Sequence, residues 1–171
     1  MRVDRPRNTG DPRPKHSGND CSVGSPHAGA DVLSHLAGSV FRLGAAVEHT
    51  DAVARLLDVY VARRHPSVAP PVQTTSAALR EVVGAAVRRD TDLAVTLDAL
   101  ALDRHEPASI ASAIAVARDS ARRAREVVST ELWDCLDVTR SRMPRKVGGD
   151  RAHDFLSWAK ERSAQIGRAH V

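Results

Sequence analysis

The sequence predicts an all-α protein, an antiparallel bundle of about five helices preceded by a disordered tail. Three observations predict this fold class. Apolar residues recur every three or four positions in several long segments, as in helices that bury one face. Aromatic residues make up only 3% of the 171 residues, while Ala, Val, Leu and Arg dominate, which favours helices over sheets. No segment shows sustained alternation of apolar and polar residues, so no strand is expected.

Residues 1–30 are expected to be a disordered basic tail. They are rich in Arg, Pro, Gly, Ser and Asp and contain almost nothing to bury. The segment also lacks the apolar stretch of a secretory signal. Residues 31–171 are then expected to form one helical domain, which is long enough to bury a core.

The first predicted helix runs from Val32 to Arg64. It ends at His65–Pro66, because the prolines of the following segment HPSVAPPVQTT break any helix. Its apolar residues follow alternating three- and four-residue steps, as in a heptad seam of more than three repeats. The seam consists of Leu33, Leu36, Val40, Leu43, Val47, Ala54 and Leu57.

Two shorter helices are predicted next. One runs from Ser76 to Arg89 and contains a tolerated Gly84, and the other runs from about Asp92 to Leu102. A turn at residues 105–107 follows, and Ser109 is a suitable N-cap for the next helix.

The segment from Ser109 to Arg140 has no Gly or Pro, and we expect it to run as one long helix that stops before Met143–Pro144. Beside its apolar stripe lies a row of arginines. The stripe consists of Ile110, Ile114, Ala117, Ala121, Ala124, Val128, Leu132 and Leu136. The row consists of Arg118, Arg122 and Arg125, with Glu126, Glu131 and Trp133 close by.

The last predicted helix follows the loop PRKVGG. Asp150 is a plausible N-cap, and Phe155, Trp158 and Ile166 give the segment an apolar face. We expect both tryptophans, Trp133 and Trp158, to act as packing anchors, because the chain has few other large side chains to fill a core.

Composition disfavours several classes of function. The formal charge is +4 and the sequence pI is near 9.7, but arginines alternate with acidic residues and no aromatics are interleaved for stacking on bases. Nucleic-acid binding is therefore the least favoured function.

No apolar run approaches 18 residues, so no membrane span is expected. The two cysteines, Cys21 and Cys135, form no disulfide framework, and free thiols fit a cytoplasmic protein.

No metal or cofactor site is expected. A di-metal carboxylate bundle uses two Glu-x-x-His pairs, and the nearest approach here is Asp150-x-x-His153 at a helix start. Neither a nucleophile elbow nor a phosphate-binding glycine loop occurs.

Three segments carry a resemblance to a known family. The pattern A-R-D-S-A-R-x-x-R-E-x-x-S-x-E-x-W from Ala117 to Trp133 resembles the signature helix of the bacterial alpha-E family, an all-helical domain of unknown function. The segment DAVARLLDV at residues 51–59, together with Glu48, resembles that family's first long helix. The segment FLSWAKER at residues 155–162 resembles its later W-x-K-E-R motif. The resemblance covers residues 32 to about 166 and implies a helical fold.

The first helix departs from the family pattern. The family's glutamate–arginine pair falls on Glu48 and His49, so histidine replaces the arginine. Gly38, Arg42 and the pair at residues 45–46 also stand where the family usually has acidic, basic or aromatic residues. The chain therefore resembles a divergent member.

The end of the chain looks artificial. The last six residues, IGRAHV, are what a widely used DNA-sequencing adapter encodes in one reading frame. We expect the natural sequence to stop near Gln165, with residues 166–171 artefactual, so that the chain is a fragment carrying about the N-terminal half of the family's domain.

The candidate site is a carboxylate–guanidinium network. Glu48, Asp51, Arg55 and Asp58 share one helix face, and we hypothesise that they meet the arginine row across the interface of the two long helices. The interpretation as structural pairing is favoured over a ligand or partner site. The full candidate set is Glu48, Asp51, Arg55, Asp58, Arg118, Arg122, Arg125, Glu126, Glu131, Lys160, Glu161 and Arg162, the last three from the W-x-K-E-R resemblance.

Three functions remain open. Because alpha-E members are encoded beside or fused to ATP-grasp-type ligases and transglutaminase-like proteins, the resemblance implies a non-catalytic partner domain in a peptide-forming or peptide-modifying system. The alternatives are an enzyme that uses the Glu–Arg network in the bundle core and, less favoured, a basic nucleic-acid-binding bundle.

Overall fold

The structure is a computed structural model that describes residues 26–63, 76–86, 92–147 and 151–169. These residues form helices only, in the order α1 (Pro26–Ala62), α2 (Ser76–Val82), α3 (Leu93–Leu102), α4 (Ile110–Arg123), α5 (Thr130–Ser141) and α6 (Ala152–Ala169). The all-α prediction is confirmed. None of the described helices has the length and apolar character that crossing a membrane requires.

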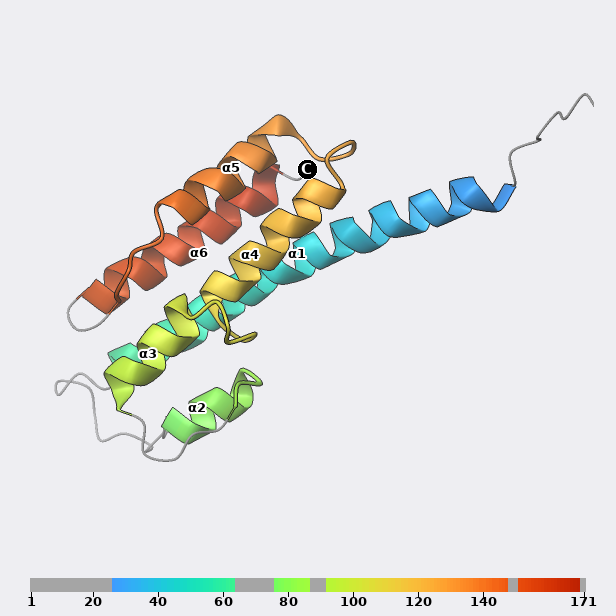
Figure 1. The fold of residues 1–171 in the computed structure, drawn as a ribbon. Coiled ribbons are helices and arrows are strands. Elements are labelled where there is room, and N and C mark those ends of the chain that lie inside the picture. Colours follow the sequence, from blue (N-terminus) through green and yellow to red (C-terminus); the bar gives the residue numbers. More distant parts are fainter. Residues whose placement is uncertain (1–25, 64–75, 87–91, 148–150, 170–171) are drawn as a thin grey trace, which may run out of the picture.

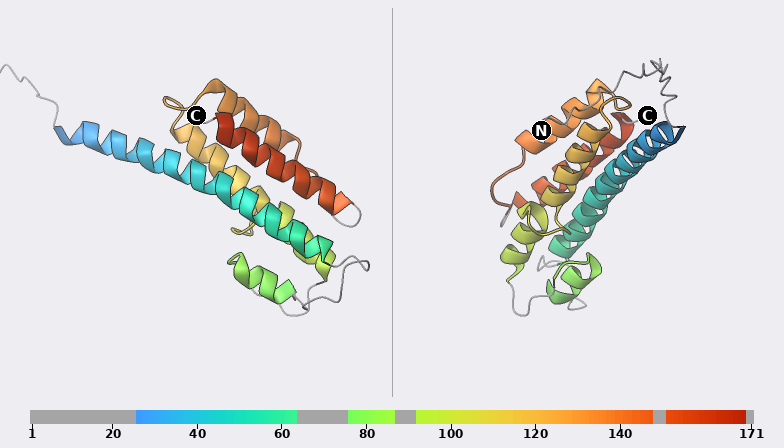
Figure 2. Two further views of the ribbon diagram at one scale, coloured as in Figure 1. Left: turned by 180° about the vertical axis from the view of Figure 1, so that it is seen from behind. Right: turned by 45° about the vertical axis from the view of Figure 1, so that its right-hand side comes forward.

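Four of the helices form an up-and-down bundle (Figures 1 and 2). Helix α1 packs against α4 and α6, and α5 closes the ring by packing against α4 and α6 in turn. Helix α3 packs against the N-terminal part of α4, and α2 lies at the end of the bundle where α1 finishes. The bundle is the architecture that short connections between antiparallel helices favour.

Two apolar clusters fill the bundle. The larger one joins the C-terminal half of α1 to α2, α3 and the N-terminal ends of α4 and α6, and Leu57, Leu100 and Ile110 are fully buried in it. The smaller one lies between α1, α4, α5 and α6 and contains Leu43 and Leu136. Burying each such side chain contributes about 1.5–3 kcal/mol.

The heptad seam predicted for α1 is buried only in part. Burial is complete at Leu43, but Leu33 is 68% exposed, because the N-terminal part of α1 extends past the other helices (Figure 1). The helix also begins before the expected Val32, so its first residues belong to the segment expected as tail. Residues 1–25, Cys21 included, lie outside the described residues.

The segment expected as one long helix is two helices. Helix α4 ends at Arg123, residues 124–129 turn, and α5 begins at Thr130. Ser129 caps α5 by accepting a hydrogen bond from the Leu132 amide, with extended backbone angles. Because the chain folds back, Ala121 and Leu136 enter the same apolar cluster, whereas a single straight helix would carry half of its apolar stripe away from the bundle.

The second predicted helix also ends earlier than expected. Helix α2 stops at Val82, and Gly84 has a positive φ of 74° that side chains with a Cβ rarely adopt. The Gly84 and Ala85 amides donate to the carbonyls of Glu81 and Arg80, so the glycine terminates the helix instead of lying within it. Residues 87–89 of the predicted helix lie outside the described residues.

The remaining elements follow the sequence prediction closely. Helix α3 spans the expected segment, and Ser109 caps α4 by accepting from the Ser112 amide at 3.0 Å. The proposed cap Asp150 lies outside the described residues. Both Trp133 and Trp158 are half-buried and pack against the clusters, with the Trp158 ring 5.7 Å from that of Phe155.

Candidate functional site

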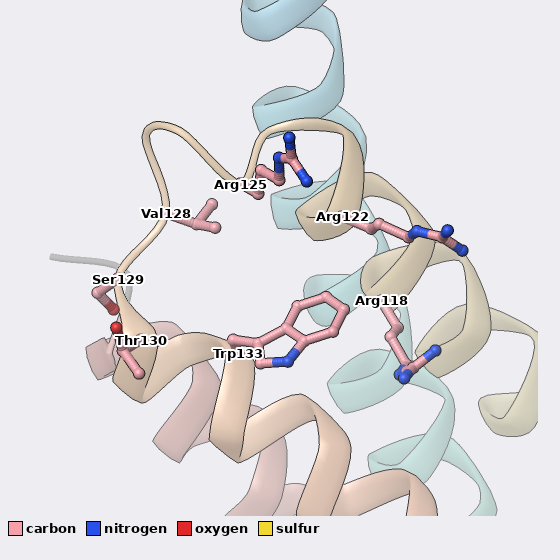
Figure 3. Close-up of a pocket in the computed structure, with 7 residues that line it drawn as sticks. All are labelled: Arg118, Arg122, Arg125, Val128, Ser129, Thr130 and Trp133. Carbon is pink, nitrogen blue, oxygen red and sulfur yellow. The ribbon is translucent and has the colours of Figure 1, made fainter.

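A pocket of about 490 Å³ opens where α4 turns back into α5 (Figure 3). Three arginines, one tryptophan and three residues at the end of the turn and the start of α5 line it, and no carboxylate lines it. We call it the arginine pocket and define it by Arg118, Arg122, Arg125, Val128, Ser129, Thr130 and Trp133.

The local sequence explains why these side chains gather. Arg118 and Arg122 are four residues apart, so they share one face at the end of α4, and Arg125 follows three residues later in the turn. The turn then reverses the chain, and Trp133 in the first turn of α5 extends toward the arginines (Figure 3). The reversal that the sequence prediction missed is therefore what creates the pocket.

Arg118 is held in place. Its Nη2 and Nε lie 3.0 and 3.1 Å from Oδ1 of Asp137 on α5, and its guanidinium carbon lies 5.1 Å from the centre of the Trp133 ring. An ion pair combined with a cation–π contact restricts the side chain at one wall of the pocket. With Arg118 30% and Asp137 54% exposed, water screens the pair, so it contributes at most about 1 kcal/mol.

The other two arginines carry uncompensated charge. Within the described part of the chain, Arg122 and Arg125 form no ion pair, and both are exposed. The hydroxyl of Ser129 is already used, because it donates to the Ala169 carbonyl and accepts from the Leu132 amide. The pocket therefore offers guanidinium donors and an aromatic face, which suit an oxyanion, and no group that resembles a general base.

The α1 carboxylates do not meet the arginine row. Asp51 pairs with Arg55 of its own helix at 2.5 Å and accepts a hydrogen bond from Ser163 of α6. The hydrogen bond and charge of Asp51 raise the pKa of Arg55. Glu48 is exposed, without an ion pair among the described residues. The hypothesis of a network between the first helix and the arginine row is therefore wrong, because this face of α1 turns toward α6.

Asp58 joins α1 to α6. Its two carboxylate oxygens lie 2.6 Å from Nζ of Lys160 and 2.7 Å from Nδ1 of His153. Burial acts to raise the pKa of Asp58, but the hydrogen bonds and charges of Lys160 and His153 outweigh it, and the net shift is downward. Asp58 and Lys160 are therefore paired as an interhelical contact.

The other candidates divide into one anchor and three surface residues. Arg162 donates to Oγ1 of Thr139 and to the Cys135 carbonyl, which fastens α6 to α5. The remaining three are exposed and, among the described residues, have no ion pair: Glu126, Glu131 and Glu161.

Histidine at the position that resembles the family's arginine still makes a tertiary contact. Nε2 of His49 lies 3.1 Å from the Ala108 carbonyl, just before α4 begins. Because a carbonyl can only accept, the ring nitrogen donates in this contact. Glu48 and His49 therefore have separate surroundings, the first in solvent and the second at the α1–α4 interface.

The sequence reasoning missed a buried ion pair. Nη2 of Arg80 lies 3.0 Å from Oε2 of Glu106, and their side chains are only 3% and 11% exposed. Nε of Arg80 also donates to the Ala86 carbonyl at 2.7 Å. Nothing in the local spacing distinguishes Arg80 from an arginine on a solvent-exposed helix face, so only the tertiary structure identifies it.

No cation site was found among the described residues, where no cluster of three or more His, Cys, Asp or Glu side chains could hold a metal ion. His153, half of the one pair considered from the sequence, contacts Asp58 instead. Cys135 is a free, half-buried thiol.

Comparison with known families gives one result. The family model Alpha-E, described as a predicted alpha-helical domain with a conserved ER motif, matches residues 32–168. No curated protein and no solved structure is detectably similar to the chain. The match covers the whole bundle and most of the chain.

Proposed function

The chain belongs to the Alpha-E family, and we propose that it is a non-catalytic helical partner domain that binds a carboxylate-bearing segment of a protein or peptide in the arginine pocket. The observation that carries this proposal is the pair of exposed guanidiniums, Arg122 and Arg125, beside the fixed Arg118 and the face of Trp133.

The chemistry of the pocket suits a carboxylate. A guanidinium is planar and can donate two parallel hydrogen bonds to the two oxygens of a carboxylate, which gives both charge and direction. Such a bond between charged groups contributes about 1.5–3 kcal/mol. The indole ring adds apolar contact area next to the charge, as in many protein-binding surfaces.

The lining residues favour binding over catalysis. No histidine or carboxylate lines the arginine pocket, and the Ser129 hydroxyl serves as a helix cap. The Glu–Arg network on which an enzymatic function would depend is not assembled in the described bundle, where Asp51 pairs within α1, Asp58 pairs with α6 and Glu48 forms no ion pair.

We further propose that the partner belongs to a peptide-forming or peptide-modifying system with an ATP-grasp-type ligase and a transglutaminase-like protein. The support is the resemblance of the three sequence segments to a family whose members are encoded beside such proteins. A peptide carries carboxylates at its C-terminus and at Asp and Glu side chains, which are the groups that the arginine pocket suits.

The test is co-purification of the full chain with the ATP-grasp-type ligase and the transglutaminase-like protein encoded nearest to its gene. We expect one of them to bind, and the double variant R122Q/R125Q to weaken that binding at least tenfold. The control is R123Q, because Arg123 is adjacent in sequence but lies outside the pocket and pairs with Asp119. Equal weakening by the control, or no binding of either protein, would contradict the proposal.

A further inference from the structure

A second cluster of arginines lies at the other end of the α4–α5 pair. A pocket of about 270 Å³ is lined there by Arg104, Arg140 and Arg145, with Ile114 and Met143 among its apolar residues and no acidic residue. We call it the distal pocket. It involves the N-terminal half of α4 and the C-terminal end of α5, whereas the arginine pocket involves the opposite ends.

The two pockets lie on one face of the α4–α5 pair, and we call the surface that joins them the groove. On α4, the distal pocket is lined by Ala111 and Ala115 and the arginine pocket by Arg118 and Arg122, and these four residues follow steps of four, three and four on one helix face. On α5, Trp133, Asp137 and Arg140 follow the same steps. The Arg118–Asp137 ion pair crosses the groove between the two pockets.

The charge along this groove is almost entirely positive. The two pockets together contain six arginines, and within the described part of the chain only Arg118 has a carboxylate partner. The other five are Arg104, Arg122, Arg125, Arg140 and Arg145. Their mutual repulsion is unfavourable until an anionic ligand lies between them.

We propose that this groove binds an extended acidic peptide, with one carboxylate in each pocket and about three residues between the two acidic ones. The inference rests on the proposed function, because it assumes that the arginine pocket takes carboxylates, and it adds the length and spacing of the ligand.

The spacing follows from helix geometry. On α4, the lining residues are centred near residue 113 in the distal pocket and near residue 120 in the arginine pocket, about 10 Å apart at a rise of 1.5 Å per residue, and Arg125 extends the arginine pocket beyond the end of α4. In an extended peptide, residues i and i+4 point to the same side and lie about 13 Å apart. Residues i and i+2 are only about 7 Å apart and cannot reach both pockets.

The middle of the groove favours an extended ligand over a helical one. A helix would need an apolar strip to pack against, but the Arg118–Asp137 ion pair occupies that position. A single-stranded nucleic acid would gain from several aromatic side chains on which its bases could stack, and Trp133 is the only aromatic residue lining either pocket. An acidic peptide needs only cations at the right spacing.

Asp137 provides a variant that separates binding from structure. Its carboxylate is the acidic group that faces Arg118 across the groove, so D137N should release Arg118 and remove a repulsive charge next to the peptide. We expect D137N to bind the acidic peptide severalfold more tightly. A purely structural role of the ion pair would instead leave the affinity unchanged or lower it.

The experiment measures fluorescence anisotropy of labelled, C-terminally amidated peptides with the full chain at low salt. The peptides are Glu-Ser-Ser-Ser-Glu, Glu-Ser-Glu-Ser-Ser and a control with a single Glu. We expect the first to bind at least about fivefold more tightly than the second, because only the first engages both pockets at once. R140Q should reduce its affinity to that of the single-Glu peptide, and R123Q should leave it unchanged.

The possible outcomes separate the two proposals. One outcome would leave only the arginine pocket: binding of all three peptides depends on Arg122, R140Q does not change their affinity, and the spacing of the two glutamates does not matter. The groove proposal would then fail. If no peptide binds, the groove proposal and the carboxylate pocket fail together. If a five-nucleotide single-stranded RNA binds more tightly than the best peptide, the acidic-peptide class is wrong.

Discussion

Glu106→Ala tests the energetics of the bundle most directly, because it leaves the buried Arg80 guanidinium without its carboxylate partner. The Arg80 side chain is 3% exposed, and its guanidinium loses the carboxylate 3.0 Å away while its bond to the Ala86 carbonyl remains. Removing one member of a buried pair costs about 3–5 kcal/mol. That is a large part of the roughly 5–15 kcal/mol by which a typical domain is stable.

Replacing both partners should cost much less. In Arg80→Met with Glu106→Leu, no charge remains buried, and the main loss is the hydrogen bond to the Ala86 carbonyl, about 1 kcal/mol. The double variant should therefore be more stable than Glu106→Ala alone, although it carries more substitutions. Urea denaturation followed by far-ultraviolet circular dichroism measures the free energy of unfolding of the parent, of Glu106→Ala and of the double variant.

The exposed pair on α4 supplies the control. Arg123 and Asp119 are 62% and 55% exposed at a spacing of four residues, so Asp119→Ala should cost only about 0.3–0.5 kcal/mol. If Glu106→Ala costs no more than this control, Arg80 is solvated in solution and α2 is not docked as the structure shows.

Three further predictions concern the α1–α6 contact, α4 and α5. The folded-state pKa of Asp58 is lowered, so its stabilisation should be complete above the unfolded value of about 3.9 and lost as the pH falls below it. Thermal denaturation of Asp58→Asn against the parent should therefore differ at pH 6 to 7, with the gap narrowing as the pH falls below about 3.9. Ser109→Ala should cost about 1–2 kcal/mol in chemical denaturation, because it removes a buried N-cap. Trp133→Ala should cost about 3 kcal/mol, the lower end for aromatic side chains in cores, since the indole is half-buried. If Trp133→Ala is as stable as the parent, the indole lines the pocket without contributing to the packing of the core.

Periodicity predicted most of the helices because each buries one face. The Ser109 cap and the start of α2 at Ser76 agree with the structure for the same local reasons. The break between α4 and α5 was missed, because Ser129 looks like a helical serine until the chain reverses and its hydroxyl meets the Leu132 amide and the Ala169 carbonyl. The second of these bonds joins residues 40 positions apart, which no local pattern encodes.

Helical spacing identifies which residues share a face but not which neighbour that face meets. Asp51 and Asp58 do share a face, as predicted, yet α1 packs against both α4 and α6, and the spacing is compatible with either. The choice depends on apolar packing, which directs Leu43 and Leu57 into the two clusters and leaves the aspartates toward α6. The arginine row was correctly grouped because its members come from one short stretch of the chain, the end of α4 and the start of the turn that follows it.

The pairing of charges inside the bundle leaves a local group of unpaired arginines beside α4 and α5. Asp51 and Asp58 of α1 are matched by cations of α1 and α6, and Arg80 is matched by Glu106, so these groups contribute little to the outer field. The five arginines along the α4–α5 groove are not matched by any carboxylate of the described residues. The formal charge of +4 belongs to the whole sequence, and residues outside the described structure supply most of it, so it is not a property of this groove. The five arginines are a local cluster, with Arg122 on α4, Arg140 on α5 and the others in the adjoining turns and loops. Such a cluster at defined positions favours selective recognition of an anionic partner over diffuse attraction to any polyanion.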